Sequence, residues 1–146
     1  GISWKGGFDN TKRTRSISLE KISQIFDQNK NLDFYCLHNE YDEQEKKKLN
    51  KYNNVFYYLG NEMNFSNTSA LCNNLDLTIT IDTVIAHISC AAGMETWILL
   101  RKNPAFLFPF NKKKSLRYPT AKYINQDRFN DWKSVIDKVS LDLKNL

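Results

Sequence analysis

The stretch TIDTVIAHISCAAG, residues 80–93, places a carboxylate, a hydroxyl and an imidazole where an apolar run meets a small-residue helix. Thr83 and His87 are four residues apart, so both would face the same side of that helix. The first N–H groups of such a helix lack internal partners and attract anions. This arrangement predicts a site for a phosphate-bearing ligand, with Asp82 binding sugar hydroxyls or fixing the tautomer of His87.

These residues also have structural interpretations. Asp82 and Thr83 are typical helix-capping residues, and the two positions suit capping and ligand binding equally well. A single histidine beside Ala86 and Cys90 is more often packed in a core than functional. The elements around these residues must decide between the two interpretations.

Short apolar runs that alternate with segments of helical character predict those elements. The expected strands cover residues 1–6, 32–38, 55–60, 75–82, 95–100 and 121–125. The expected helices cover residues 18–26, 41–52, 67–75, 83–93 and 131–146, with Ser18 as an N-cap and Gly93 as a C′ residue. This alternation predicts an α/β fold, a Rossmann-like, doubly wound parallel sheet of about six strands.

One segment interrupts the alternation. Pro104, Pro109 and Pro119 prevent a regular helix at residues 101–119, which predicts a long loop. The loop also carries Phe106, Phe108 and Phe110, which we expect in a core or at a domain interface. Long ordered loops in compact domains are often functional.

Ligands of open parallel sheets bind beyond the carboxyl ends of the strands, near the point where the strand order reverses. The residues that follow the expected strands are therefore the site candidates: Lys5, Arg13 and Arg15; His38, Asn39 and Glu40; Met63 and Phe65; Asp82, Thr83 and His87. The two arginines can form bidentate bonds with phosphate oxygens. Gly6 and Gly7 permit close approach of the backbone to a ligand, but they form neither a GxGxxG motif nor a P-loop.

Composition bounds the class of protein. The 146 residues fit a single domain, residues 1–146, and the net charge of +5 favours an anionic partner. Because no apolar stretch is long enough to span a bilayer, we expect a soluble chain without a transmembrane segment. Three widely spaced cysteines, Cys36, Cys72 and Cys90, indicate buried thiols in a reducing compartment, and hence a cytoplasmic location. The first residues resemble the interior of a protein, which leaves open that the chain is a fragment.

Several stretches together resemble the donor-binding half of heptosyltransferase-like (family 9 type) glycosyltransferases. The resemblance is nearest to the glycosyltransferase domains that follow tetratricopeptide repeats in bacteria. It rests on GISWKG (1–6), RSISLE (15–20), LCNNLDLTITIDTVIAHISCAAG (71–93), ETWILL (95–100) and the helix at 132–139. It implies a GT-B enzyme in which this chain is the C-terminal, donor-binding domain, while the N-terminal acceptor domain is absent from the chain.

The resemblance implies roles for individual residues. The family's Asp-Thr-x-x-x-His segment contacts the nucleotide diphosphate-sugar, and it corresponds here to Asp82, Thr83 and His87. Arg15 corresponds to a basic residue that contacts phosphate, with Lys5 as a second phosphate contact. The remaining correspondences place Glu40 near the donor and Met63 and Phe65 near the nucleobase.

The chemistry implied is transfer of a sugar to an acceptor hydroxyl, with no metal and no other cofactor. His87 and Arg15 would offset the charge on the departing phosphate. The expected partners are the nucleotide-sugar donor and the acceptor or tetratricopeptide-repeat domain of the parent chain, with no nucleic acid. The Phe- and Lys-rich loop at 101–119 departs from the family's pattern, which leaves the sugar open.

Two other functions remain compatible with the sequence. A non-catalytic nucleotide or nucleotide-sugar binding module would carry the same binding residues. A basic nucleic-acid-binding domain is a third, less favoured interpretation, based on the net charge and the Lys/Arg clusters at 11–15 and 111–117. That interpretation predicts binding that weakens strongly with salt.

Overall fold

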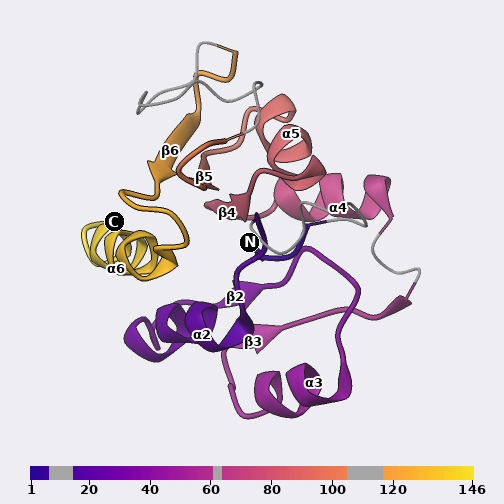
Figure 1. Cartoon of the computed structure of the whole chain (residues 1–146). Helices are drawn as coiled ribbons and strands as arrows, with labels where there is room; N and C mark the ends of the chain where they lie inside the picture. Colours follow the sequence, from indigo (N-terminus) through magenta and orange to yellow (C-terminus); the bar gives the residue numbers. More distant parts are fainter. Residues whose placement is uncertain (7–14, 61–63, 105–116) are drawn as a thin grey trace.

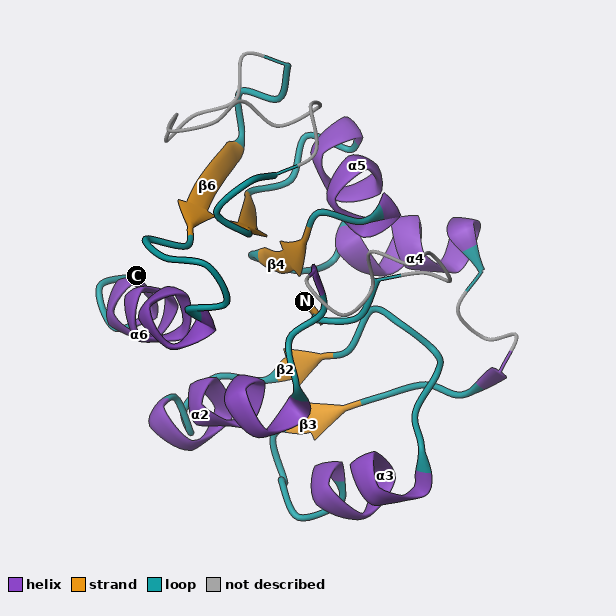
Figure 2. Ribbon diagram, viewed as in Figure 1, coloured by secondary structure: helices purple, strands orange, loops and turns teal. Residues whose placement is uncertain are grey.

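The computed structural model describes residues 1–6, 15–60, 64–104 and 117–146, in which strands and helices alternate (Figures 1 and 2). The strands are β1 Ile2–Ser3, β2 Phe34–Tyr35, β3 Val55–Phe56, β4 Thr78–Ile81, β5 Thr96–Leu100 and β6 Ala121–Asn125. The helices are α2 Leu19–Gln28, α3 Glu43–Leu49, α4 Phe65–Cys72, α5 Val84–Ala91 and α6 Trp132–Leu143. Each expected strand and helix has a counterpart here, although β1, β2 and β3 are only two residues long.

All strand pairs are parallel. A four-stranded sheet has the order β1-β4-β5-β6, and β2 pairs with β3 in a separate two-stranded sheet. An isolated parallel bridge between Ile2 and Cys36 joins the two sheets, supported by a 2.9 Å hydrogen bond from the Leu37 N–H to the Ile2 carbonyl. The fold is therefore Rossmann-like α/β. The sequence predicted one sheet of about six strands, whereas the structure has a sheet of four strands and a sheet of two. The strands β1 and β2 are so short that they pair with each other through a single bridge, which does not merge the two sheets into one.

Helices cover both faces of the four-stranded sheet. In Figure 1, α2 and α6 lie side by side on one side of the strands, and α4 and α5 pack together on the other. Alternate residues of β5 follow this division: Leu99 joins the core beneath α2 and α6, whereas Ile98 packs with Ala86 and Cys90 of α5. Burial of both faces explains why the strands are apolar runs without alternation.

The chain changes direction within the strand order between β1 and β4. From β1 it continues to β2 and β3 on one side, and from β4 to β5 and β6 on the other. Segments that leave the carboxyl ends of β1 and β4 therefore diverge, which is the arrangement that opens a ligand-binding crevice in this class of fold.

Local sequence signals behave largely as expected. Ser18 is the N-cap of α2, although its side chain makes no capping hydrogen bond with any described residue. Gly93 follows the C-cap of α5 with a φ of +77°, a conformation that favours glycine. All three cysteines are buried free thiols, as predicted. Burial raises the pKa of the Cys36 thiol to about 12.

The predicted loop at 101–119 is described only at its ends. Residues 101–104 and 117–119 form neither helix nor strand, and the three phenylalanines lie in 105–116, outside the described residues. Within the described ranges, none of the helices combines the length and apolar character required to cross a membrane.

Candidate functional site

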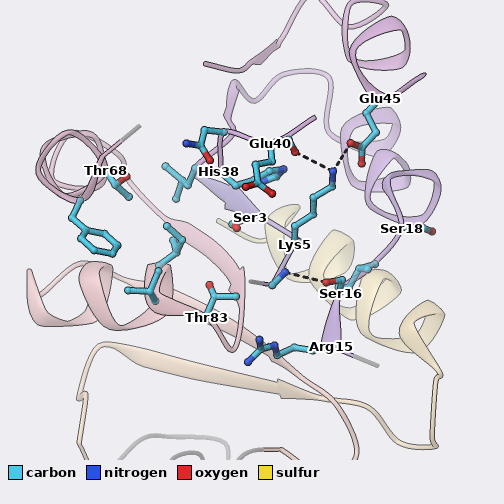
Figure 3. Close-up of a pocket in the computed structure, with 17 residues that line it drawn as sticks. Ser3, Lys5, Arg15, Ser16, Ser18, His38, Glu40, Glu45, Thr68 and Thr83 are labelled. Carbon is cyan, nitrogen blue, oxygen red and sulfur yellow. Dashed lines mark hydrogen bonds and ion pairs between the residues drawn. The ribbon is translucent and has the colours of Figure 1, made fainter. Parts of the chain in front are cut away.

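A cleft of about 760 Å³ opens at the carboxyl ends of β1, β2 and β4 (Figure 3). Its volume falls within the range of small-molecule sites, roughly 300–1,000 Å³. Segments far apart in the sequence meet there: the end of β1, the start of α2, the loop after β2, and the N-terminal ends of α4 and α5. Seven of the candidate residues line the cleft; they are Lys5, Arg15, His38, Asn39, Glu40, Phe65 and Thr83.

Arg15 is held at the edge of the cleft by Asp82. The Arg15 Nε lies 3.6 Å from the Asp82 Oδ1, and the Arg15 Nη1 donates to the Asp82 carbonyl at 3.3 Å. The Asp82 side chain is only 3% exposed, so water screens this pair weakly. A guanidinium has five N–H donors, so contacts with Asp82 leave donors that a ligand in the cleft can use. Asp82 thus orients Arg15, a role that sequence reasoning did not assign to it.

Gly6 also fixes the position of Arg15. A Cβ atom built on Gly6 would lie 2.8 Å from the Arg15 Nε and 3.3 Å from its Cζ. The guanidinium therefore rests against the Gly6 backbone, and a larger residue at position 6 would require the Arg15 side chain to shift. The Gly6 N–H is satisfied separately, by donating to the Ser16 Oγ at 3.0 Å.

Lys5 is held at another part of the cleft. Its Nζ pairs with the carboxylate of Glu45 and donates to the Glu40 carbonyl at 3.0 Å (Figure 3). Glu45 is itself fixed, because its carboxylate accepts from the Asp42 N–H in the capping box that begins α3. The cap of a neighbouring helix thereby determines where the Lys5 charge lies.

Thr83 occupies the N-cap position of α5 with an extended backbone, φ −128° and ψ 179°. Its side chain makes no capping hydrogen bond with any described residue, and its Oγ1 lies 3.4 Å from the Thr80 Oγ1. Thr83, Val84 and Ile85 all line the cleft, so the positive end of the helix dipole faces it. The capping interpretation is thus correct for the backbone position but not for the hydroxyl.

His87 lies elsewhere. Its Nδ1 is 3.0 Å from the Tyr118 hydroxyl oxygen, and it is not among the described residues that line the cleft. The expected alignment with Thr83 assumed helical geometry at both positions. Because Thr83 is an extended N-cap residue, a spacing of four does not bring the two side chains to one side. The structure therefore brings Thr83, but not His87, into the cleft.

No protein-family model, curated protein or solved structure matches the chain. The resemblance to heptosyltransferase-like enzymes therefore stays a prediction. Two predicted site residues, Arg13 and Met63, lie outside the described residues. Phe65 lines the cleft and is 70% exposed, so it offers a flat apolar surface at the start of α4.

Charges within the described lining balance. Lys5 and Arg15 are offset by Glu40 and Glu45, so the net positive charge of the chain is not concentrated here. Attraction for an anion must come from the Arg15 donors and from the N-terminal end of α5. Within the described ranges, no cluster of three or more His, Cys, Asp or Glu side chains could hold a metal ion.

Sequence reasoning placed His38 at the end of its strand but favoured Glu40 over it. In the structure His38 lines the cleft and packs edge-on against Trp4, with ring centroids 4.2 Å apart. The Tyr41 ring lies on it as well, with centroids 4.7 Å apart. Burial, aided by the nearby charge of Lys5, lowers the pKa of the imidazole to about 3, so His38 is neutral at physiological pH. The sequence signal that could have indicated a packed His38 is the pair of tyrosines around it, Tyr35 and Tyr41.

Proposed function

We propose that this chain is the donor-binding domain of a glycosyltransferase and that its cleft binds a nucleotide diphosphate-sugar. The observation that supports this most directly is the Arg15 guanidinium, fixed by Asp82 and Gly6 at the edge of a cleft that also receives the N-terminal end of α5. Both features bind phosphate oxygens, and they lie where a Rossmann-like fold binds nucleotides. The family resemblance of the sequence points to the same ligand.

In this proposal the diphosphate lies between Arg15 and the first turn of α5. The helix N–H groups and the guanidinium donate to its oxygens, and the Thr83 hydroxyl supplies a further donor. These donors stabilise the negative charge that develops on the diphosphate when the bond to the anomeric carbon breaks, so that the reaction needs no metal. The acceptor hydroxyl and the base that deprotonates it belong to the second half of a GT-B enzyme, and the two sheets described here form the donor half.

One observation favours a second candidate, a nucleotide-sugar binding module without catalytic activity. His87, one of the two residues expected to offset charge on the departing phosphate, bonds to Tyr118 instead of lining the cleft. Binding requires only Arg15 and the end of α5, whereas transfer requires more. Sugar transfer by the parent protein to an acceptor separates the two candidates.

The binding step can be tested on this chain. We expect ADP-, UDP- or GDP-sugars to raise its melting temperature, because a ligand that binds only the folded state stabilises it. Arg15→Ala should weaken the affinity of the best ligand by about ten-fold to a hundred-fold, the cost of losing hydrogen bonds to a charged group. Calorimetric titration measures this.

Lys122→Ala is the matched control. Lys122 is also a cation paired with a carboxylate, 2.8 Å from Asp142, but it lies on β6 and does not line the cleft. Its loss should leave affinity unchanged. Equal losses in both variants, or binding of single-stranded nucleic acid in preference to every nucleotide-sugar, would contradict the proposal.

A further inference from the structure

The charged side chains of the cleft lie in two groups. Arg15 forms the first, near the N-terminal end of α5, and its partner Asp82 is not among the described residues that line the cleft. Lys5, Glu40 and Glu45 form the second group, at the loop after β2 and the start of α3. Figure 3 shows the Lys5 side chain directed toward the two glutamates and away from Arg15. The two groups therefore present different charges to different parts of one ligand.

The second group carries no net positive charge. The Lys5 ammonium pairs with the Glu45 carboxylate, and the Glu45 side chain is only 14% exposed, so water screens the pair weakly. The carboxylate is held in place, because it also accepts from the Asp42 N–H at the cap of α3. Glu40 lines the cleft as an exposed residue and adds a second negative charge. With one cation and two carboxylates, this part of the described lining is negative overall.

This distribution disfavours a second anionic group on the ligand. A phosphate or carboxylate beside the two glutamates would meet like charges in a partly buried place, where repulsion is screened less than in bulk water. An uncharged hydroxyl group fits better. Among the described residues, the Glu45 carboxylate and the Glu40 carbonyl accept two of the three ammonium N–H groups of Lys5, which leaves the third for a hydroxyl oxygen. The exposed carboxylate of Glu40 can accept from the hydroxyl hydrogen.

We propose that Glu45 is a specificity-determining residue of the cleft: by neutralising Lys5, it restricts the group attached to the diphosphate to an uncharged one that carries hydroxyls. This inference rests on the proposed function and narrows its substrate class to neutral sugars, which excludes sugar acids and a third phosphate. The diphosphate remains at Arg15 and the N-terminal end of α5. Lys5 thereby has a role other than the phosphate contact that the family resemblance implies.

The test compares ligands that share a nucleoside diphosphate and differ in the group attached to it. Calorimetry measures the affinities of ADP-, UDP- and GDP-glucose and of ATP, UTP and GTP, all without divalent cations. Glucose is uncharged and carries hydroxyls, whereas the third phosphate is anionic. With the base that binds best, we expect the wild type to bind the glucose derivative about ten-fold more tightly than the triphosphate.

Glu45→Gln removes the negative charge at nearly constant shape. Glutamine can still accept from the Asp42 N–H, because a capping box works with either residue at this position. The Lys5 charge is then no longer offset, so the affinity for the triphosphate should rise by about ten-fold, while that for the glucose derivative should change by less than two-fold. A damaged fold does not produce a selective gain of affinity. Glu40→Gln should give a smaller gain of the same kind, since an exposed carboxylate is screened more strongly.

Glu43→Gln is the matched control. Glu43 lies in the same first turn of α3 and pairs with Lys46 at 2.7 Å, but its side chain is 79% exposed and is not among the described residues that line the cleft. Its substitution changes the net charge of the protein by the same amount as Glu45→Gln. Both affinities should stay within about two-fold of the wild type. An equal gain for the triphosphate in both variants would overturn the inference, because it would show an effect of overall charge.

The outcomes separate this inference from the proposed function. If the wild type prefers the glucose derivative but Glu45→Gln leaves that preference unchanged, the specificity role is wrong and the donor-binding function stands. If the wild type binds the triphosphate as tightly as the glucose derivative, the specificity role is also wrong, although the cleft still binds a nucleotide-sugar. If the wild type binds none of the three glucose derivatives, both proposals fail.

Discussion

The two histidines of the chain illustrate how differently the same side chain is used on the two sides of this molecule. His38 lies at the carboxyl end of β2, between Trp4 and Tyr41, with ring nitrogens that contact no polar partner in the described part of the chain. His87 lies on α5, where its Nδ1 meets the hydroxyl of Tyr118. The first is an unsatisfied group in a cleft, and the second is part of a hydrogen-bonded contact beside the β5–β6 connection.

The difference teaches that a helical spacing is weaker evidence for a site than a position at a strand end. His87 attracted attention because it follows Thr83 by four residues, but the extended backbone of Thr83 breaks that relation. His38 needed no such relation, since the carboxyl ends of parallel strands meet at one edge of the sheet. Substitutions at and around the two histidines can test whether they differ in function as they do in surroundings.

The largest effect should follow from removing the support of His38. Trp4 is completely buried, and its ring packs against both His38 and Phe26. Trp4→Ala should lower the free energy of unfolding by about 3–5 kcal/mol, because it leaves a cavity in the core. Urea denaturation measures this loss. A loss below about 1 kcal/mol would mean that His38 is not held by this packing.

Acid should affect stability through His38. Its pKa is lowered from 6.5 to about 3 in the folded state, so the unfolded chain binds more protons between these values. This contribution should be complete above pH 6.5 and be lost as the pH drops towards 3, by an amount on the order of 4 kcal/mol. The charges and rings that face the imidazole are those of Lys5, Tyr41 and Trp4.

Urea denaturation of the wild type and of His38→Phe at several pH values isolates this contribution. The variant should lose less stability than the wild type between pH 6.5 and pH 4. Identical profiles for the two proteins would show that the imidazole titrates normally and is not buried as described.

A smaller effect should come from the contact that positions Arg15. Gly6→Ala places a methyl group where the guanidinium lies, so Arg15 must move away from Asp82. We expect nucleotide-sugar affinity to fall by about ten-fold, with the melting temperature nearly unchanged. In the double variant with Arg15→Ala, the Gly6 substitution should have no further effect, and additive losses would contradict a role through Arg15.

The smallest effect should be found at the other histidine. Tyr118→Phe removes the hydroxyl that lies 3.0 Å from the His87 Nδ1 and should cost about 0.5–1.5 kcal/mol of stability. Ligand affinity should stay the same, because neither residue lines the cleft. A marked loss of nucleotide-sugar binding would return His87 to the site, as the sequence had suggested.

The fold was largely predictable from sequence because it depends on patterns of apolar residues. The buried faces of α2 and α6 consist of the residues that their helical spacing selects, such as Ile22 and Val135. The division of the strands into two sheets was not predictable, since the length over which short strands pair depends on the surrounding loops. Segments such as 55–60 supply only two paired residues.

The site was predictable in its location but not in its contacts. The rule that ligands bind at strand ends correctly gathered Lys5, Arg15, Glu40 and Thr83 around one cleft. Which carboxylate would face Arg15 depended on the distance between β1 and β4, information that a single sequence does not contain. For the same reason, the burial of His38 could only be found from the fold.

The single bridge between Ile2 and Cys36 has a mechanical consequence. The cleft lies across the junction of the two sheets, and a backbone hydrogen bond from the Leu37 N–H to the Ile2 carbonyl crosses this junction beside the bridge. A ligand that contacts β1, β2 and α5 together would hold the two sheets against each other. The Leu37 amide hydrogen therefore reports on ligand binding, because its exchange with deuterated solvent should slow when the cleft is filled.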